Sequence, residues 1–253
     1  VVDEGATYDD EAYGRGESET GKKYISDFNT KVNVNSNIEM GGAKSTAFFA
    51  KSGAIIDSTN STVKITGHSS KGALAYSVED YESKDIVDSD GKNKGAQPKT
   101  EIIVKSIEAS ADGTKDSEKK ANMGAIAISQ DGTEIGTGDV SVTVKKDVKV
   151  YGVGAFASGE KAKVTIEGKN SEITSATNGA LVATNKGTIN FGGGKINHEK
   201  DGDVAFYSEK KIVGGKTVVS HLNFTDATTL NISKGLVFYG DKEDYSKELI
   251  PAS

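Results

Sequence analysis

The residues that come closest to a catalytic motif are Gly16, Gly21 and Lys22, which have the spacing of a phosphate-binding loop. In such a loop, backbone N–H groups hold the phosphates, the lysine reaches the β- and γ-phosphates, and the next residue is a Ser or Thr that holds Mg²⁺. That position is Lys23 here, and two glutamates inside the loop would repel phosphate. The segment therefore does not predict a nucleotide site.

The histidines do not form a set with catalytic or metal-binding spacing. His68 and Ser69 are neighbours in a segment that is one residue too long for a nucleophile elbow, so we interpret them as a corner of the chain. Neither His198 nor His221 has a second metal ligand two or four residues away, which a zinc site would need. The sequence predicts no metal ion and no cofactor.

Residues 88–93 contain part of the pattern of a calcium-binding loop. When this segment is aligned on its glycine, the EF-hand register places Ile86 at the first ligand position and Gln97 at the last. Both positions require an acidic residue in a functional loop. A solvated turn is therefore the better interpretation of this segment.

The longest polar interruption of the chain, residues 77–100, is where we predict a ligand-binding site. Tyr81 lies among acidic residues there, and Tyr76 stands at the base of the segment. A tyrosine offers a flat apolar face and a hydroxyl group, which suits stacking on a sugar ring or anchoring a protein contact. A solvated loop without a partner remains the alternative. The candidate ligand-binding residues are Tyr76, Tyr81, Asp85, Asp88, Asp90 and Asn93.

The fold that positions any such site is indicated by a repeated short pattern. The pattern is a small residue followed by apolar residues, and the chain contains seven copies of it. The copies lie 24 to 52 residues apart. Self-similarity at such a period is the signature of a solenoid, in which each repeat packs on its neighbours. The copies start at Ala47, Ala73, Ala125, Ala155, Ala180, Val204 and Leu236.

Residues 151–206 show the pattern most clearly. Three short alternating segments recur within every 25 residues or so, separated by Gly, Asn, Ser and Lys, and no helical period is visible. Each strand must then pair with the strand one turn away, and parallel crossovers are right-handed in nearly all proteins. The predicted fold is all-β: a right-handed, single-stranded parallel β-helix with three strands per turn and about seven turns.

Alternation predicts which side chains point inward. We expect pairs of inward residues, each pair separated by one outward residue, to stack into a continuous apolar column. The outward residues between them are mostly Thr and Asn, which suit a ladder of hydrogen bonds. The expected inward pairs are Val63/Ile65, Val142/Val144, Val164/Ile166, Ile189/Phe191, Leu222/Phe224 and Leu230/Ile232.

The alternative function is a carbohydrate-active β-helix domain, a polysaccharide lyase or hydrolase. Such an enzyme needs two or three carboxylates held together on one outer face. Among the outward positions that flank the expected inward pairs, Glu167 is the only acid. We therefore predict no enzymatic activity, and the alternative requires chemistry located in the insertions.

Charge and composition divide the chain. The first 20 residues hold seven acids and one base, Arg15, and so account for the whole net charge of −6. Because the remainder is balanced, we predict no nucleic-acid partner. Residues 1–27 are an acidic irregular head or excursion, and residues 28–253 form the β-helix, with insertions at 77–100 and 110–121 and a smaller excursion at 209–216.

The chain has no cysteine and no run of 18 apolar residues. A disulfide framework, a transmembrane helix and a signal peptide are therefore not predicted. The chain begins with Val rather than Met, so we expect a processed product or a fragment of a longer protein.

The glycine–alanine segments at residues 154–157 and 179–183, each followed by an alternating strand, carry a resemblance to a known family. They resemble the β-helical passenger region of type V secretion autotransporters. Together with 30 lysines beside a single arginine, the chain is similar to the large fusobacterial outer-membrane adhesins.

This resemblance implies a non-enzymatic adhesin passenger, exposed at the cell surface beyond the outer membrane or released from it. The implied partner is a glycan or protein receptor on host or bacterial surfaces. It also implies a monomer that does not itself insert into a membrane. The family's membrane barrel and protease triad are not found in this sequence.

Overall fold

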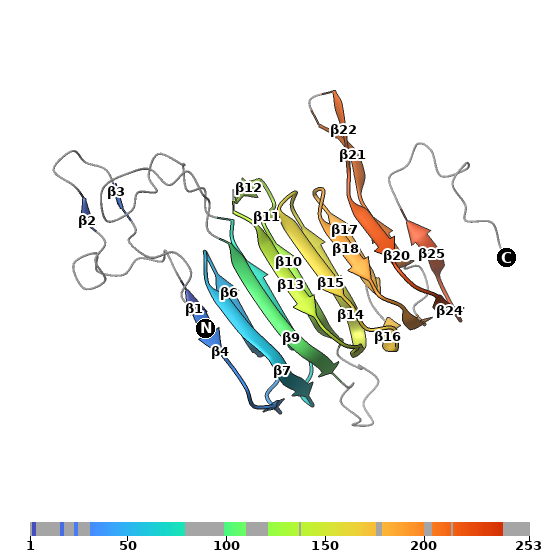
Figure 1. Cartoon of the computed structure of the whole chain (residues 1–253). Helices are drawn as coiled ribbons and strands as arrows, with labels where there is room; N and C mark the ends of the chain where they lie inside the picture. Colours follow the sequence, from blue (N-terminus) through green and yellow to red (C-terminus); the bar gives the residue numbers. More distant parts are fainter. Residues whose placement is uncertain are drawn as a thin grey trace.

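The computed structural model describes residues 2–3, 16–17, 23–24, 31–78, 99–109, 121–136, 138–175, 179–199, 204–213 and 215–239. These residues are all-β: they form 25 strands, and no helix occurs among them. Nineteen of the strands belong to one large sheet, in which every strand pair is parallel. Figure 1 shows these strands lying side by side along one axis.

The parallel strands form three rows, which we name A, B and C in the order in which the chain visits them. We call one passage of the chain through rows A, B and C a pass. Within each row, a strand pairs in register with the strand that the chain formed one pass earlier. Row A consists of β1 (Val2–Asp3), β6 (Thr46–Lys51), β8 (Lys71–Tyr76), β10 (Asn122–Ile128), the end of β14 (Val148–Ser158), β17 (Leu181–Thr184), β20 (Val204–Ser208) and β25 (Leu236–Tyr239).

Rows B and C follow each other along the chain and share two strands, β7 and β9, whereas β14 runs from row C into row A. Row B consists of β4 (Lys31–Asn33), the starts of β7 (Ile55–Ile65) and β9 (Thr100–Ala109), β13 (Val140–Val144), β15 (Ala162–Ile166), β18 (Thr188–Phe191) and β23 (His221–Phe224). Row C consists of β5 (Ile38–Met40), the ends of β7 and β9, the start of β14, β16 (Ser171–Ser175), β19 (Gly194–His198) and β24 (Thr228–Ile232).

Six short strands stand outside the large sheet and form three antiparallel pairs. These are β2 (Gly16–Glu17) with β3 (Lys23–Tyr24), β11 (Gln130–Asp131) with β12 (Glu134–Ile135), and β21 (Lys210–Val213) with β22 (Lys216–Val219). All three lie between a strand of row A and the next strand of row B.

The sequence repeat marks row A, because each of its seven copies lies in a row A strand or directly before one. Glycines in this repeat are needed for close packing. A Cβ atom at Gly154 would lie 2.2 Å from Cδ1 of Ile173, and one at Gly72 would lie 2.6 Å from Cγ2 of Ile107. The row C isoleucines therefore occupy the space that a side chain on these row A residues would fill.

The predicted inward register is confirmed in the middle of row B. Val164 pairs with Val142 on one side and with Ile189 on the other, and all three side chains are buried. Ile166 likewise lies between Val144 and Phe191. Apolar side chains in consecutive strands thus form one continuous core.

The single predicted column is wrong in one respect, because its six pairs belong to two columns. Val63/Ile65 and Leu230/Ile232 lie in row C, whereas the other four pairs lie in row B. At the end of row B, Phe224 remains 42% exposed, since no later strand of that row is described to cover it. It still packs edge-on against Phe191 and Phe206.

The expected ladder of outward polar residues is present in rows B and C. Asn223 donates its side-chain N–H to Oδ1 of Asn190 at 2.9 Å, and Asn190 donates to Oγ1 of Thr165 at 3.4 Å. In row C, Asn231 donates to Asn197 at 2.9 Å. These bonds run along the same axis as the backbone hydrogen bonds and reinforce the register of the strands.

Candidate ligand-binding corner

The long connections of the chain concentrate where row A leads into row B. Three of these connections are short and span residues 52–54, 159–161 and 185–187. Four are longer and span residues 4–30, 77–99, 129–139 and 209–220. We call this edge of the molecule the hairpin corner. The other predicted insertion, residues 110–121, connects row C to row A instead.

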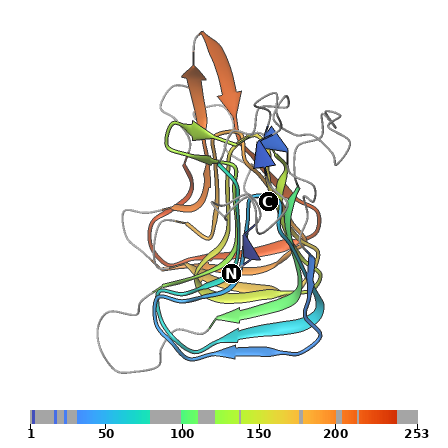
Figure 2. The ribbon, with the colours of Figure 1, turned by 90° about the vertical axis from the view of Figure 1, so that its left-hand side faces the viewer.

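Two antiparallel hairpins rise from the hairpin corner. The β11–β12 hairpin follows β10, and the β21–β22 hairpin follows β20. Figures 1 and 2 show both hairpins projecting on the same side of the molecule. Each hairpin exposes an isoleucine: Ile135, opposite Gln130 at the base of β11–β12, is 57% exposed, and Ile212, opposite Thr217 in β21–β22, is 72% exposed. Each is a single exposed apolar side chain on its projection, and its burial by a partner would remove apolar surface from water.

One of these hairpins was predicted from the sequence, and the other was not. The smaller excursion predicted at residues 209–216 is confirmed and extends to Val219. The β11–β12 hairpin was not predicted. Its signal was the dipeptide Asp131–Gly132, a pairing that favours a tight hairpin turn because glycine accepts a positive φ.

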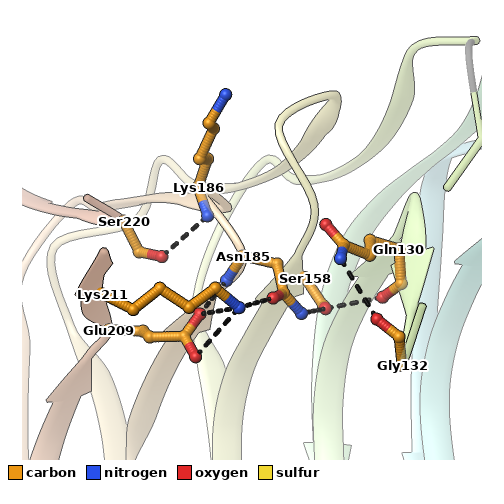
Figure 3. Close-up of polar contacts among 8 residues, drawn as sticks. All are labelled: Gln130, Gly132, Ser158, Asn185, Lys186, Glu209, Lys211 and Ser220. Carbon is orange, nitrogen blue, oxygen red and sulfur yellow. Dashed lines mark hydrogen bonds and ion pairs between the residues drawn. The ribbon is translucent and has the colours of Figure 1, made fainter. Parts of the chain in front are cut away.

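A chain of hydrogen bonds joins the bases of the two hairpins, as Figure 3 shows. Ser158 Oγ donates to the backbone oxygen of Gln130 at 2.7 Å, and Asn185 Nδ2 donates to Ser158 Oγ at 3.0 Å. The ammonium group of Lys211 donates to Oδ1 of Asn185, and the backbone N–H of Asn185 donates to Oε2 of Glu209 at 2.5 Å. Four consecutive passes of the chain are linked in this way.

Asn185 holds its central place because of its backbone conformation. Its φ of 51° and the φ of 69° at Lys186 lie in the left-handed region, which asparagine tolerates better than most residues. This turn points the Asn185 side chain toward both neighbouring passes. The next backbone N–H, that of Lys186, donates to Oγ of Ser220 at 3.0 Å, at the end of the second hairpin.

Charged groups at the corner are paired. Lys211 lies 3.3 Å from the carboxylate of Glu209, whose side chain is 17% exposed. Lys186 Nζ lies 2.7 Å from Oε2 of Glu160. The hydrogen bond from Lys186, and then its positive charge, hold the pKa of the Glu160 carboxyl below its usual range. Two ion pairs therefore lie among the hydrogen-bonded polar groups at the bases of the hairpins.

Of the predicted binding residues, Tyr76 lies at the hairpin corner. It ends β8, is half-buried, and its hydroxyl donates to Oδ2 of Asp131 in the β11–β12 hairpin at 3.5 Å. The backbone of Ser77 lies against the base of this hairpin so closely that a Cβ atom at Gly136 would come within 2.0 Å of its oxygen. The other five candidates, Tyr81, Asp85, Asp88, Asp90 and Asn93, lie outside the described residues.

The three histidines lie apart from one another. His68 is half-buried at the corner between β7 and β8, where its Nδ1 lies 3.3 Å from Oγ of Ser69, as a corner pair would. His198 is fully buried in row C, and His221 is exposed. Across the described part of the chain, no group of three or more His, Asp or Glu residues could hold a metal ion.

A second, shallower feature lies where row B leads into row C. A hollow of about 420 Å³ opens there, beside an ion pair between Lys169 and Asp226. Its walls include both Glu172 and Lys195, so it has no single sign of charge. Its lining residues include no large apolar or aromatic side chain, so the hollow is a weaker candidate site than the hairpin corner.

Acidic residues are more frequent on the outer faces than the sequence analysis indicated. Its survey of outward positions covered six segments and found Glu167 alone. Strands β5, β9 and β16 add Glu39, Glu101, Glu108 and Glu172 to the outward side of rows B and C. These strands were not among the six inward pairs, so their outward residues were not counted.

No family model matches the chain, and no curated protein or solved structure matches it either. Within the described ranges, the chain contains no helix that is long and apolar enough to span a bilayer. The functional assignment therefore rests on the fold and on the hairpin corner.

Proposed function

We propose that this chain is a non-enzymatic adhesin passenger of the autotransporter type, built as a right-handed parallel β-helix of about seven turns with three strands each. The in-register rows A, B and C support this architecture, because a chain that visits three rows in a fixed order winds around an axis. On this proposal the solenoid is a rigid stalk, displayed at the cell surface, and its insertions carry the ligand site.

The single observation that carries the binding proposal is the pair of projecting hairpins, each with an exposed isoleucine, whose bases are joined by one chain of hydrogen bonds. Exposed aliphatic side chains contribute binding energy when a partner removes them from water, and a surrounding polar rim gives orientation. This arrangement fits a protein receptor. A sugar would be better served by exposed aromatic faces, so a glycan ligand is the competing outcome of the test.

The hydrogen-bond chain at the base would hold the two hairpins at a fixed separation. The row A strands that bear them, β10 and β20, are three strand spacings apart, or about 14 Å. A partner that contacts both hairpins would then bind without ordering either of them, which lowers the entropic cost of binding.

The test is binding of the fluorescently labelled chain to host epithelial cells and to bacterial cells. The double variant Ile135→Ser/Ile212→Ser should reduce binding at least about tenfold, since it removes two apolar contacts. The matched control is Val237→Ser in β25, an aliphatic residue of comparable exposure (41%) away from the corner. Equal binding by the double variant and the wild type would refute this site.

Two treatments of the cells separate the ligand classes. Loss of binding after trypsin treatment of the cells supports a protein receptor. Loss after glycosidase treatment, with trypsin-treated cells still binding, indicates a glycan instead. Incubation of the chain with a panel of polysaccharides should release no product; release of product would support the carbohydrate-active alternative.

The site predicted from sequence at residues 77–100 needs its own variant. Replacing residues 79–97 with a short Gly-Ser linker should leave the melting temperature unchanged, because the flanking strands β8 and β9 pair with their neighbours independently of the connection. If cell binding is also unchanged, the ligand is held by the hairpins alone. If binding is lost, the site extends from Tyr76 into this segment.

A further inference from the structure

The outward residues at the centre of row C alternate in charge over six successive strands. The strand register places each of them directly beside the next. We call this column the charge ladder. Its members, in order along the axis, are Glu39, Lys64, Glu108, Lys149, Glu172 and Lys195.

The charge ladder is accessible. All six residues are exposed, and they extend over five strand spacings, or about 24 Å. Polar residues flank the ladder on both sides: Thr62 and Ser106 share a hydrogen bond at 2.9 Å on one side, and Asn197 donates to Thr174 at 3.4 Å on the other, where Tyr151 pairs with Thr174.

Most of these charges are not neutralised by their neighbours. Lys64 Nζ lies 3.1 Å from Oε1 of Glu39. Within the described part of the chain, none of the other four forms an ion pair within 4.0 Å, although each has an opposite charge in the adjacent strand. These four are Glu108, Lys149, Glu172 and Lys195.

We propose that the charge ladder is a lateral contact surface for a second copy of this chain, with the two axes antiparallel and related by a twofold axis. A ladder of six alternating charges, read backwards, has the opposite charge at every position. Glu39 then faces Lys195 of the second copy, Lys64 faces Glu172, and Glu108 faces Lys149. Each contact occurs twice, so six ion pairs form and the assembly closes as a dimer.

Other occupants fit this pattern less well. A partner with charge of a single sign, such as a nucleic acid or an anionic membrane, would meet as many repulsive as attractive groups on the charge ladder. A parallel copy in the same register would oppose glutamate to glutamate and lysine to lysine. Antiparallel self-pairing satisfies all six positions without any conformational change.

The proposal is independent of the proposed function, because the ladder lies in row C and the receptor site lies at the hairpin corner. Exposed ion pairs are individually weak, so one pair of molecules associates only transiently. When many copies are displayed on two surfaces, however, the surfaces bind each other with avidity, because each contact that forms keeps neighbouring copies close enough to form the next. Surfaces coated with the chain should therefore adhere to each other.

The test uses beads coated with the chain at high density. Wild-type beads should cluster in about 0.01 M salt and separate in about 1 M salt, where the Debye length falls from about 30 Å to about 3 Å. Clustering that persists at the higher salt concentration would overturn the proposal, because it would show an apolar contact.

Two charge reversals at the twofold axis make the test specific. Glu108→Lys and Lys149→Glu each oppose like charges in two of the six contacts, so each variant alone should cluster at least about fivefold less than wild type. A mixture of beads carrying the one variant with beads carrying the other should cluster as wild type does, because lysine then faces glutamate again.

A matched control guards against effects of net charge. Lys163→Glu makes the same change of charge as Lys149→Glu on an exposed residue of row B, outside the ladder, and should cluster as wild type does. Wild-type clustering by either single reversal overturns the proposal. Failure of the mixed beads to cluster also overturns the proposal. It would indicate that the alternating charges serve only to stabilise the stacking of strands within one chain.

Discussion

Ile166 lies directly beside Phe191 in the inward column of row B, and the two side chains are 1% and 0% exposed. On its other side Ile166 adjoins Val144, which is also fully buried. Thr165, one residue away, points outward and accepts a hydrogen bond from Asn190. Two adjacent residues of one strand thus face opposite environments, and charge should be tolerated at only one of them.

Ile166→Asp should abolish cooperative thermal unfolding. An unpaired carboxylate in this column costs several kcal/mol, which is comparable to the whole stability of a typical domain, about 5–15 kcal/mol. Thr165→Asp is the matched control and should change the melting temperature little, because an aspartate there can still accept from Asn190. Similar damage from both substitutions, measured by circular dichroism, would contradict the assignment of faces.

Asn185→Ala should destabilise the chain more than Asn185→Gly does. Both variants lose the bonds to Ser158 and Lys211, each worth about 0.5–1.5 kcal/mol. Alanine additionally strains the left-handed backbone at φ 51°, whereas glycine adopts it freely. Chemical denaturation should show the order wild type, glycine, alanine. Cell binding should fall in both variants, because the hairpins lose their common support.

Asp57 should contribute to the acid sensitivity of the fold. The hydroxyl of Thr59 donates to its carboxylate at 2.7 Å and Lys31 lies 3.2 Å away, and these contacts lower the pKa of Asp57 below 3.8. A carboxyl with a lowered folded-state pKa stabilises the fold above its unfolded-state pKa. That contribution is lost as the pH falls through the folded-state value.

The measurement is the drop in melting temperature between about pH 5 and about pH 2, a window that spans the loss of this contribution. Asp57→Asn should show a smaller drop than wild type. Asp139→Asn, an exposed aspartate 3.8 Å from Lys161, is the control and should resemble wild type. A full wild-type drop in Asp57→Asn would exclude this carboxyl as a contributor.

His198→Leu should stabilise the chain. His198 is 0% exposed and packs in row C beside Ile232, and neither ring nitrogen has a hydrogen-bond partner among the residues that the structure describes. Replacing an unsatisfied buried polar group by an apolar one of similar size should raise the free energy of unfolding by about 1–2 kcal/mol. His221→Leu, at an exposed site, should have no such effect. A destabilised His198→Leu would show that the imidazole has a favourable role.

Much of the fold could be predicted from the sequence because alternation identifies inward residues and the glycine–alanine repeat identifies row A. The register at Val164 followed directly, since residues 151–206 have nearly constant spacing. Alternation alone does not say which row a pair belongs to. Val63/Ile65 was therefore assigned to the same column as Val142/Val144, although the first pair lies in row C and the second lies in row B.

The site was harder to predict than the core. Tyr76 was identified from its position at the base of a polar segment, and its contact with Asp131 depends on the β11–β12 hairpin, which the sequence analysis missed. The charge ladder was hidden for a similar reason. Its successive members are separated by 23 to 44 residues, and only the register of row C reveals that they are neighbours.

Connections of very different length join equivalent strands at the hairpin corner. Residues 52–54 suffice between β6 and β7, whereas residues 77–99 connect β8 to β9. Loop-closure entropy rises only slowly with length, so a segment here can be enlarged or exchanged at small cost while the strands on both sides keep their partners. Insertions and deletions at this one edge would therefore let related chains bind different receptors while they keep the same core.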